Sequence, residues 1–276
     1  MLIPTINPLS ATHAELDDLM NIGFCHVKLP DENLVTKIQT CLKVAREFFQ
    51  HSMEEKQKWQ LKDKLNPGDR YQGYALRSQS KNTNAIEQIF FEPDEPFGPY
   101  KTYSSLIEKI NEYYINQIYL PLIKAIFARL QLSNDNFIAA TKNAYRSLVF
   151  QSCPSTGELK NVIRLNAHKD FGLLTILFFE EPGLEVKYQN DWKAVPPQEG
   201  CVVVNLGNAL ELMTGKQCCS ALHRVTNATD NRISMVYFIQ PNYQQPVRNY
   251  ADNSIVAETG ELFFRQQFAE YYETDH

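Results

Sequence analysis

From about residue 144 onward, the chain consists of short strand-forming segments that follow one another closely. Turn-favouring stretches such as EEPG, PPQEG and TDN separate them. Strands at this spacing, with no helix between them, favour a sandwich or jelly-roll barrel over a parallel β-α-β sheet. We therefore expect a β core over residues 144–241, with strands at 147–150, 161–167, 172–179, 183–188, 200–206, 221–227 and 232–241.

The part of the chain before this core is mainly helical in its pattern. Apolar residues recur at steps of three and four along 31–59 and again along 102–132, where Pro121 should kink the helix. We expect one domain, 1–276, of mixed α and β structure, with an N-terminal region over 1–100 and a C-terminal helix within 258–273. The remaining expected segments are a helix at 10–21, a strand at 23–30, irregular chain at 61–100 and the closing helix itself at 260–273.

Charge and composition exclude several kinds of partner. The net charge of -5 gives no general attraction to nucleic acid or to an anionic membrane. No window approaches the roughly 20 apolar residues of a membrane span, and the N-terminal sequence MLIPTINPLS lacks the pattern of a signal peptide. The six cysteines form no CxxC pair, which is typical of free thiols in a reducing compartment. We expect a cytoplasmic protein, a monomer or weak homodimer, that acts on a small molecule.

Three residues in the β region have the chemistry of metal ligands. His168 and Asp170 stand two apart at the start of a strand-forming run, so they can share one face while Lys169 points away. His223 follows about fifty residues later in SALHRVTN. Each alone has an ordinary structural interpretation. Together, two histidines and a carboxylate suit a non-haem Fe(II) oxygenase, although a zinc hydrolase can use the same set.

A second pair favours the iron alternative. Arg232 and Ser234 share a strand face in NRISMVYFIQP, nine residues and more after His223. A guanidinium beside a hydroxyl can bind a carboxylate, with paired hydrogen bonds from the arginine and one from the serine. A zinc hydrolase has no need of such a clamp, whereas an oxygenase that holds a dicarboxylate cosubstrate does.

The stretch 163–241 resembles the isopenicillin N synthase-like family of Fe(II)/2-oxoglutarate-dependent oxygenases. The matching pieces, in the family's order, are RLNAHKDFGLLTIL, GLEVKYQNDWKAVPPQEGCVVVNLGNALELMTGK, SALHRVT and NRISMVYFIQP. IPTINPL, NIGFCHVK, AREFFQHSMEEKQKW and RYQGYALR extend the resemblance toward the N-terminus. ELMTGKQCCSALHRV and the closing helix most resemble bacterial ethylene-forming-enzyme-like members.

The resemblance implies a double-stranded β-helix core, a distorted jelly roll, with the iron inside one mouth and helices flanking it. It implies His168, Asp170 and His223 as the Fe(II) ligands, and Arg232 and Ser234 as the residues that bind the distal carboxylate of 2-oxoglutarate. Oxygen would complete the site. No catalytic residue beyond the metal ligands is implied.

The sequence departs from the family's pattern on the strand before the HxD motif. Many members carry an arginine or asparagine and a tyrosine-proline pair there, whereas this chain has VFQSCP, with Gln151 and Ser152 at roughly those positions. The third cosubstrate contact is therefore open. Possible pocket residues, for each of which plain packing is an alternative, are Gln151, Asn166, Phe171, Arg70 and Tyr74.

The sequence thus predicts a dioxygenase that couples oxidative decarboxylation of 2-oxoglutarate to hydroxylation or desaturation of a small molecule. Two alternatives remain at this point. One is an iron oxidase that does not use 2-oxoglutarate, as isopenicillin N synthase does not. The other is a binding or effector protein on an inactive oxygenase scaffold.

Overall fold

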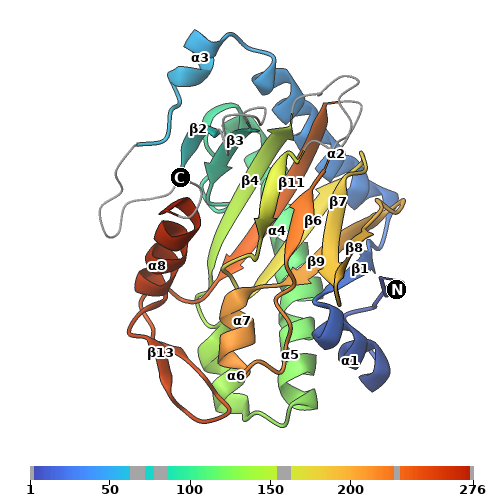
Figure 1. Cartoon of the computed structure of the whole chain (residues 1–276). Coiled ribbons are helices and arrows are strands. Elements are labelled where there is room, and N and C mark those ends of the chain that lie inside the picture. Colours follow the sequence, from blue (N-terminus) through green and yellow to red (C-terminus); the bar gives the residue numbers. More distant parts are fainter. Residues whose placement is uncertain (1–2, 63–71, 78–85, 154–162, 227–230, 274–276) are drawn as a thin grey trace.

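The computed structural model describes residues 3–62, 72–77, 86–153, 163–226 and 231–273. Its centre is a seven-stranded antiparallel sheet in the order β1-β9-β6-β11-β4-β3-β2. A four-stranded sheet, β5-β10-β7-β8, accompanies it. The predicted mixed fold with a jelly-roll core is confirmed (Figure 1). The large sheet contains β1 (Phe24–Lys28), β2 (Gly73–Arg77), β3 (Ile86–Phe91), β4 (Tyr145–Cys153), β6 (Leu174–Phe179), β9 (Cys201–Leu206) and β11 (Arg232–Gln240).

The smaller sheets and the helices complete the architecture. The four-stranded sheet contains β5 (Leu165–His168), β7 (Leu184–Tyr188), β8 (Asp191–Ala194) and β10 (His223–Val225), and β12 (Val247–Arg248) pairs with β13 (Ile255–Ala257). Among the described residues, no helix is both long and apolar enough to cross a membrane. The helices are α1 (His13–Ile22), α2 (Glu32–Phe49), α3 (Met53–Gln57), α4 (Ser104–Tyr113), α5 (Leu120–Arg129), α6 (Asn134–Thr141), α7 (Asn208–Met213) and α8 (Gly260–Glu273).

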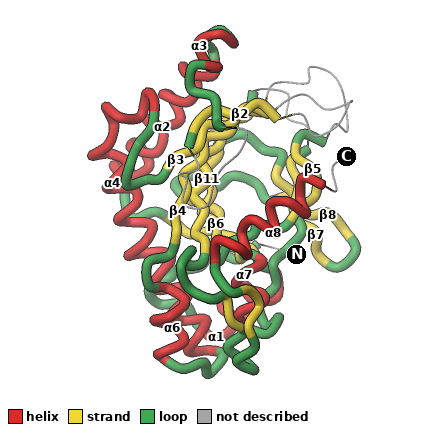
Figure 2. Tube along the Cα trace, turned by 90° about the vertical axis from the view of Figure 1, so that its left-hand side faces the viewer, coloured by secondary structure: helices red, strands yellow, loops and turns green. Residues whose placement is uncertain are grey.

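The two faces of the large sheet have different neighbours. Helices α2 and α4 lie on one side of it, and α8 lies on the other (Figure 2). Strand β11 shows the division because its residues alternate: Met235 and Tyr237 belong to the core under the helices, whereas Ser234 and Val236 line a cavity on the opposite face. A two-residue period thus separates the residues that hold the fold together from those that can meet a ligand.

Two of the expected helices are interrupted. The helix expected over 31–59 ends at Phe49, and Ser52 starts the separate helix α3 through a capping box with Glu55. The helix expected over 102–132 is α4 and α5 joined by a π-helical segment, Tyr114–Tyr119. This wider turn ends two residues before Pro121, which lacks the N–H that an α-helical turn would use.

The prediction of irregular chain over 61–100 was wrong in part. Strands β2 and β3 form a hairpin on the edge of the large sheet, and a 3-10 helix, Gly98–Tyr103, follows. The strand IEQIFF is short and interrupted by polar residues, so its assignment depends on pairing with β4, which lies about sixty residues away in the sequence.

Other strand boundaries also differ from those predicted from the sequence. Strand β4 is longer than the predicted 147–150 because β3 and β11 pair with it along its length. The strand expected at 161–167 lies partly outside the described residues, and its described part is β5. The strand expected at 221–227 is observed only over the three residues of β10. Gln189 turns the chain with φ 54°, so the DW of the predicted QNDW turn opens β8 instead. The sequence did not predict α6, α7, β12 or β13.

Two glycines allow the chain after β5 to cross from one sheet to the other. A Cβ added at Gly207 would lie 2.2 Å from the carbonyl oxygen of Gly172, and one added at Gly172 would lie 2.4 Å from the carbonyl oxygen of Ile239. The start of α7 packs against this crossing, where the N–H of Asn208 donates to the carbonyl of Asp170 at 2.7 Å. Backbone contact this close is possible only without side chains.

We expect Gly207→Ala to lower the free energy of unfolding by at least ~3 kcal/mol, because neither backbone segment can move without breaking these bonds. Gly200→Ala is the matched comparison. A Cβ there has open space but a φ of +67°, so it should cost only ~1 kcal/mol. Urea denaturation of both variants measures the difference, and equal losses would contradict the crossing's need for glycine.

Candidate functional site

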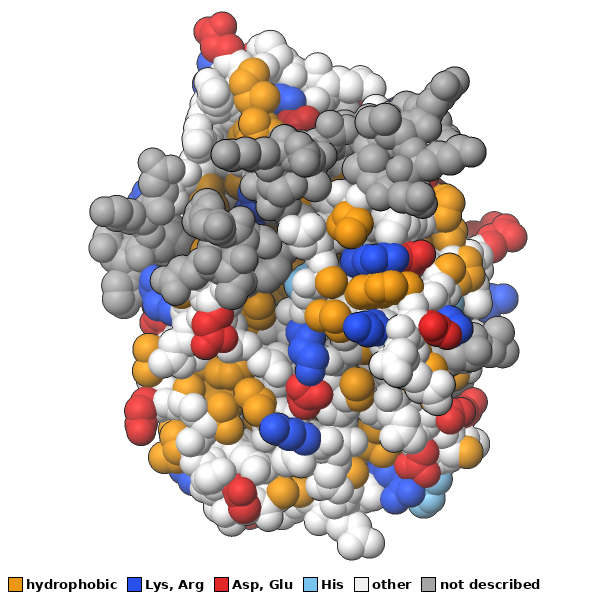
Figure 3. Space-filling model, viewed as in Figure 1, with side chains coloured by type: hydrophobic (Ala, Val, Ile, Leu, Met, Phe, Trp, Pro, Cys, Tyr) orange, Lys and Arg blue, Asp and Glu red, His pale blue; other side chains and the backbone are white. Residues whose placement is uncertain are grey.

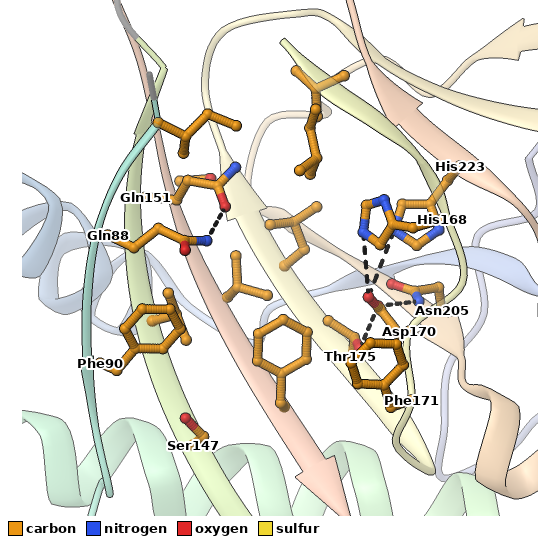
Figure 4. A pocket seen from close by; sticks show the side chains of 18 of the residues that line it. Gln88, Phe90, Ser147, Gln151, His168, Asp170, Phe171, Thr175, Asn205 and His223 are labelled. Carbon is orange, nitrogen blue, oxygen red and sulfur yellow. Dashed lines mark hydrogen bonds and ion pairs between the residues drawn. The ribbon is translucent and has the colours of Figure 1, made fainter. Parts of the chain in front are cut away.

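His168, Asp170 and His223 lie together where the two sheets approach each other. His168 ends β5 and His223 begins β10, and these two residues are directly paired across the strands. The Nε2 atoms of both histidines lie 3.7 Å from Oδ1 of Asp170. One ligand atom from each of the three residues lies within 4.8 Å of the other two (Figure 4).

The local structure differs from the sequence prediction in one respect. His168 and Asp170 were expected on alternate positions of one strand, but β5 ends at His168 and Asp170 lies in the crossing that leads to β6. The convergence therefore comes from the turn of the chain between the sheets. The ammonium of Lys169 is bound to Oε2 of Glu211 at 2.8 Å and not to the three-residue group, although Lys169 also lines the cavity.

Hydrogen bonds fix the direction in which each of the three side chains faces. Nδ1 of His168 lies 2.8 Å from the carbonyl of Asn166, and Nδ1 of His223 lies 3.1 Å from that of Ala221. Because a carbonyl only accepts, each Nδ1 carries the proton and each Nε2 keeps its lone pair toward the shared centre. Asn166, predicted as a polar contact near the motif, supplies this backbone carbonyl, and a role for its side chain stays a prediction.

Two residues that the sequence reasoning missed hold the carboxylate. Oδ2 of Asp170 accepts hydrogen bonds from Oγ1 of Thr175 at 2.6 Å and from Nδ2 of Asn205 at 2.7 Å. Both donors are buried and face each other on β6 and β9. An asparagine within the apolar run CVVVNL was the available signal, since a buried amide in a strand needs a partner.

The electrostatics suit a divalent cation. Burial, together with the nearby His223, lowers the pKa of His168 to about 4, and Asp170 only partly opposes this. Burial alone would raise the pKa of Asp170, but the two histidines and the two hydrogen bonds lower it overall. A neutral imidazole and an ionised carboxylate are the forms that bind metal. Two histidines and one carboxylate on one side fit Fe(II) with coordination positions left for other ligands.

Arg232 and Ser234 form the predicted pair on the same cavity. Arg232 is buried, its Nη1 donates to Oγ of Ser234 at 3.3 Å, and its Nε donates to the carbonyl of Glu181 at 3.3 Å. The guanidinium also lies over the ring of Phe179. Its Nη2 is buried without a hydrogen-bond partner among the described residues. A buried donor of this kind is suited to an anion that enters the cavity.

The cavity extends from these residues toward the edge strands and α8. Gln151 and Phe171, both predicted as possible pocket residues, line it. Tyr74 instead lies in the core, where its hydroxyl donates to Glu87, and Arg70 lies outside the described residues. Arg77 lines the cavity. Several other lining residues were not foreseen: Gln88 and Phe90 from an unpredicted strand, Phe264 and Phe268 from α8 at the far end of the chain, and Phe238 from the predicted strand β11.

Aromatic and basic side chains gather at this part of the molecule. The guanidinium of Arg77 lies 5.1 Å from the ring centre of Phe90 and 5.7 Å from that of Phe268. Phe264 of α8 packs edge-on against Phe171, next to Asp170. On the face shown in Figure 3, hydrophobic and Lys or Arg side chains surround a small area of histidine near the middle. The metal-binding group is thus set in a largely apolar surround.

Comparison with known proteins agrees with this geometry. Residues 137–241 match the family model of the 2OG-Fe(II) oxygenase superfamily. That range contains the two histidines, the aspartate and the Arg232–Ser234 pair. The chain therefore contains a 2OG-Fe(II) oxygenase superfamily domain, which includes the whole candidate site.

Curated relatives support the same assignment. The chain is 30% identical over 208 residues to 2-oxoglutarate-dependent dioxygenase 21, chloroplastic, of Oryza sativa subsp. japonica, covering 70% of this chain and 60% of that protein. It is 30% identical over 232 residues to thebaine 6-O-demethylase of Papaver somniferum, covering 78% and 62%. The chain thus spans less than two thirds of the length of either relative. The predicted sub-branch, ethylene-forming-enzyme-like, stays a prediction.

Solved structures show the same fold. A full-length Neurospora crassa protein, solved in complex with alpha-KG and thymine, superimposes with a TM-score of 0.77 at 18% identity, covering 98% of both chains. JOX2 in complex with 2OG, Fe and JA superimposes with a TM-score of 0.77 at 21% identity, covering 96% of this chain and 84% of that one. At these identities, the likeness concerns the fold.

We expect Thr175→Val to weaken binding of Mn(II), a stand-in for Fe(II), about 10-fold, because Asp170 loses one of the two bonds that orient its carboxylate. Thr175→Ser keeps a hydroxyl at the same position and should bind within two-fold of the wild type. Isothermal titration at neutral pH gives both affinities. If valine and serine at this position bind the metal equally well, the hydroxyl does not orient the carboxylate.

Proposed function

We propose that this protein is an Fe(II)- and 2-oxoglutarate-dependent dioxygenase that oxidises a small molecule by hydroxylation or desaturation. The observation that carries the proposal is the combination of the His168–Asp170–His223 group with a buried Arg232 on one cavity wall. A metal site alone would suit several enzyme classes. A buried guanidinium whose Nη2 has no partner in the described part of the chain adds a place for the far carboxylate of a keto diacid.

The chain's own residues divide the work of such a reaction. His168, Asp170 and His223 would hold Fe(II), and Arg232 with Ser234 would bind the distal carboxylate of 2-oxoglutarate. Bound iron and 2-oxoglutarate, with O2, would supply the oxidising chemistry, in which the keto acid is converted to succinate and CO2. The protein fixes where the substrate lies and keeps water out.

Apolar side chains between these two groups support that division. Val236 and Leu177 are directly paired on β11 and β6 and both line the cavity between Ser234 and Thr175. The carbon chain of a short diacid would pass over them without meeting an unpaired polar group. Phe171 and Phe264 close the opposite side near Asp170, which limits access of water.

We also propose a cytoplasmic location and a monomer or weak homodimer. The six cysteines are free thiols, which suits a reducing compartment. The mildly negative net charge supports a small-molecule substrate over nucleic acid or an anionic membrane surface.

Anaerobic addition of Fe(II) and then 2-oxoglutarate should produce a visible charge-transfer band, and admission of air should release succinate. His168→Ala should abolish the band and the succinate because a ligand is lost. Substrate oxidation without succinate would instead favour an iron oxidase that does not use 2-oxoglutarate. A wild-type protein that neither binds iron nor forms succinate would favour a binding protein on this scaffold.

Arg232→Met should weaken 2-oxoglutarate binding by about 100-fold, because the carboxylate would lose a charged, bidentate partner in a buried site. Arg224→Met is the control. Arg224 is bound to Glu185 and stacked on Trp192 in the four-stranded sheet, so its loss should leave the affinity unchanged. Isothermal titration of 2-oxoglutarate into the Mn(II)-loaded protein measures both, and similar affinities of the two variants would contradict the clamp.

A further inference from the structure

Two glutamines face the metal-binding group from the other side of the cavity. Gln88 on β3 and Gln151 on β4 are directly paired in the sheet register, and both line the cavity. Nε2 of Gln88 donates to Oε1 of Gln151 at 2.7 Å (Figure 4). Their two carboxamides therefore form a short polar chain on an otherwise largely apolar wall.

Gln151 stands beside the carboxylate clamp. It is paired across the strands with Ser234, so the two backbones lie roughly 5 Å apart. Its side chain is buried, with a donor group, Nε2, whose partner is Sγ of Cys153 at 3.7 Å. A thiol sulfur is a weak acceptor, whereas a carboxylate bound at Arg232 and Ser234 would be a strong one. Gln151 thus has a donor available within reach of that carboxylate.

Gln88 lies one strand further from the clamp and has an acceptor, rather than a donor, available for a ligand. Its Oε1 is buried and receives no hydrogen bond from the described part of the chain. Two strand spacings, roughly 10 Å, separate it from Ser234, which places it beyond the distal carboxylate. A buried acceptor without a donor is unfavourable, so a donor brought by a ligand would be bound there.

We propose that Gln151 and Gln88 form a carboxamide relay between cosubstrate and substrate. Gln151 binds the distal carboxylate of 2-oxoglutarate, and Gln88 accepts a hydrogen bond from an N–H or O–H group of the substrate. The proposal rests on the dioxygenase function proposed above and names its substrate class. It also assigns the third cosubstrate contact to Gln151.

The polarity of the relay follows from the carboxylate. A carboxylate only accepts hydrogen bonds, so it binds Nε2 of Gln151 and turns Oε1 toward Gln88. Nε2 of Gln88 must then donate to that oxygen, which leaves the carbonyl of Gln88 for the substrate. Bound cosubstrate therefore fixes Gln88 as an acceptor, and a substrate without a donor would leave this acceptor unpaired.

The surroundings of Gln88 restrict the substrate further. Phe90 lies two residues further along β3, and Phe238 and Phe264 line the same cavity. Among the described lining residues, Asp170 is the only acid. Among these described residues, an organic cation would thus find no carboxylate outside the metal site. The substrate class is a mainly apolar ring compound without a positive charge that carries at least one N–H or O–H donor.

Titration of 2-oxoglutarate into the Mn(II)-loaded protein tests the cosubstrate end of the relay. Gln151→Met should weaken binding about 10-fold because a bond to a charged group is lost. Gln88→Glu should weaken it as much, since a carboxylate at position 88 cannot donate to Oε1 of Gln151 and draws Nε2 away from the cosubstrate. Gln88→Met should weaken it by at most three-fold. Gln39→Met, on the exposed side of α2, should have no effect.

The relay is contradicted if Gln151→Met binds 2-oxoglutarate within two-fold of the wild type. It is also contradicted if Gln88→Glu binds it as well as Gln88→Met does. Thermal melting of each variant shows whether weaker binding reflects loss of folding. Gln88→Glu and Gln88→Met replace the same residue, so a general packing defect at this position would weaken binding in both.

Paired probes test the substrate end. Indole and 2-pyridone carry an N–H, and N-methylindole and N-methyl-2-pyridone do not. Ligand-observed NMR with the protein loaded with Mn(II) and 2-oxoglutarate should show each N–H compound bound at least five-fold more tightly than its N-methyl partner. In Gln88→Met the ratio should fall to about one. The assignment is overturned if the N–H and N-methyl compounds bind equally well, or if none of the four compounds binds. It is also overturned if the ratio of affinities is unchanged in Gln88→Met.

Failure of the relay and failure of the dioxygenase function give different results. A wild-type protein that neither binds 2-oxoglutarate nor forms succinate contradicts the proposed function itself. If the wild-type protein binds 2-oxoglutarate and forms succinate, and the Gln151 and Gln88 variants bind 2-oxoglutarate as the wild type does, only the relay is contradicted.

Discussion

The whole site depends on the way in which Asp170 is held between the two sheets. Its carboxylate is bound by Thr175 and Asn205 of the large sheet, and its backbone carbonyl is bound by the N–H of Asn208. Its other carboxylate oxygen faces two histidines that belong to the small sheet. Asp170 thus lies where the two sheets meet and faces residues of both. A cation bound to all three would strengthen the same junction, so metal binding and folding are coupled here.

Much of this site could be predicted from the sequence because it depends on a two-residue period. Arg232 and Ser234 share a face of β11, as the alternation requires, and His168 and His223 lie at the ends of strands that pair. The prediction for Asp170 succeeded in its outcome but not in its geometry. The residue leaves the strand, and the glycines at 172 and 207 allow the close crossing that brings it back to the histidines.

The remaining part of the cavity could not be predicted because it depends on pairing between distant segments. Gln88 reaches the site only because β3 pairs with β4, and the sequence around it has no strong strand pattern. Phe264 and Phe268 reach it because α8 folds back across the cavity from the end of the chain. Tyr74 was predicted as a possible pocket residue, but it lies in the core, where its hydroxyl donates to Glu87.

This division follows the architecture of the sheet. The residues assigned to metal and cosubstrate chemistry lie on β11 of the large sheet, on the paired strands β5 and β10 of the small sheet and in the hydrogen-bonded crossing between the sheets, where β6 and β9 hold Asp170. The remaining wall comes from the β2–β3 hairpin, in which β2 is the edge strand of the large sheet, and from α8. Such elements can change with little effect on the core, whereas a change in β11 or β6 would disturb two neighbouring strands at once. Gln151, on β4 between the two regions, is paired with both Ser234 and Gln88. A change at Gln88 that alters the preferred substrate must therefore leave the contact between Gln151 and the cosubstrate intact.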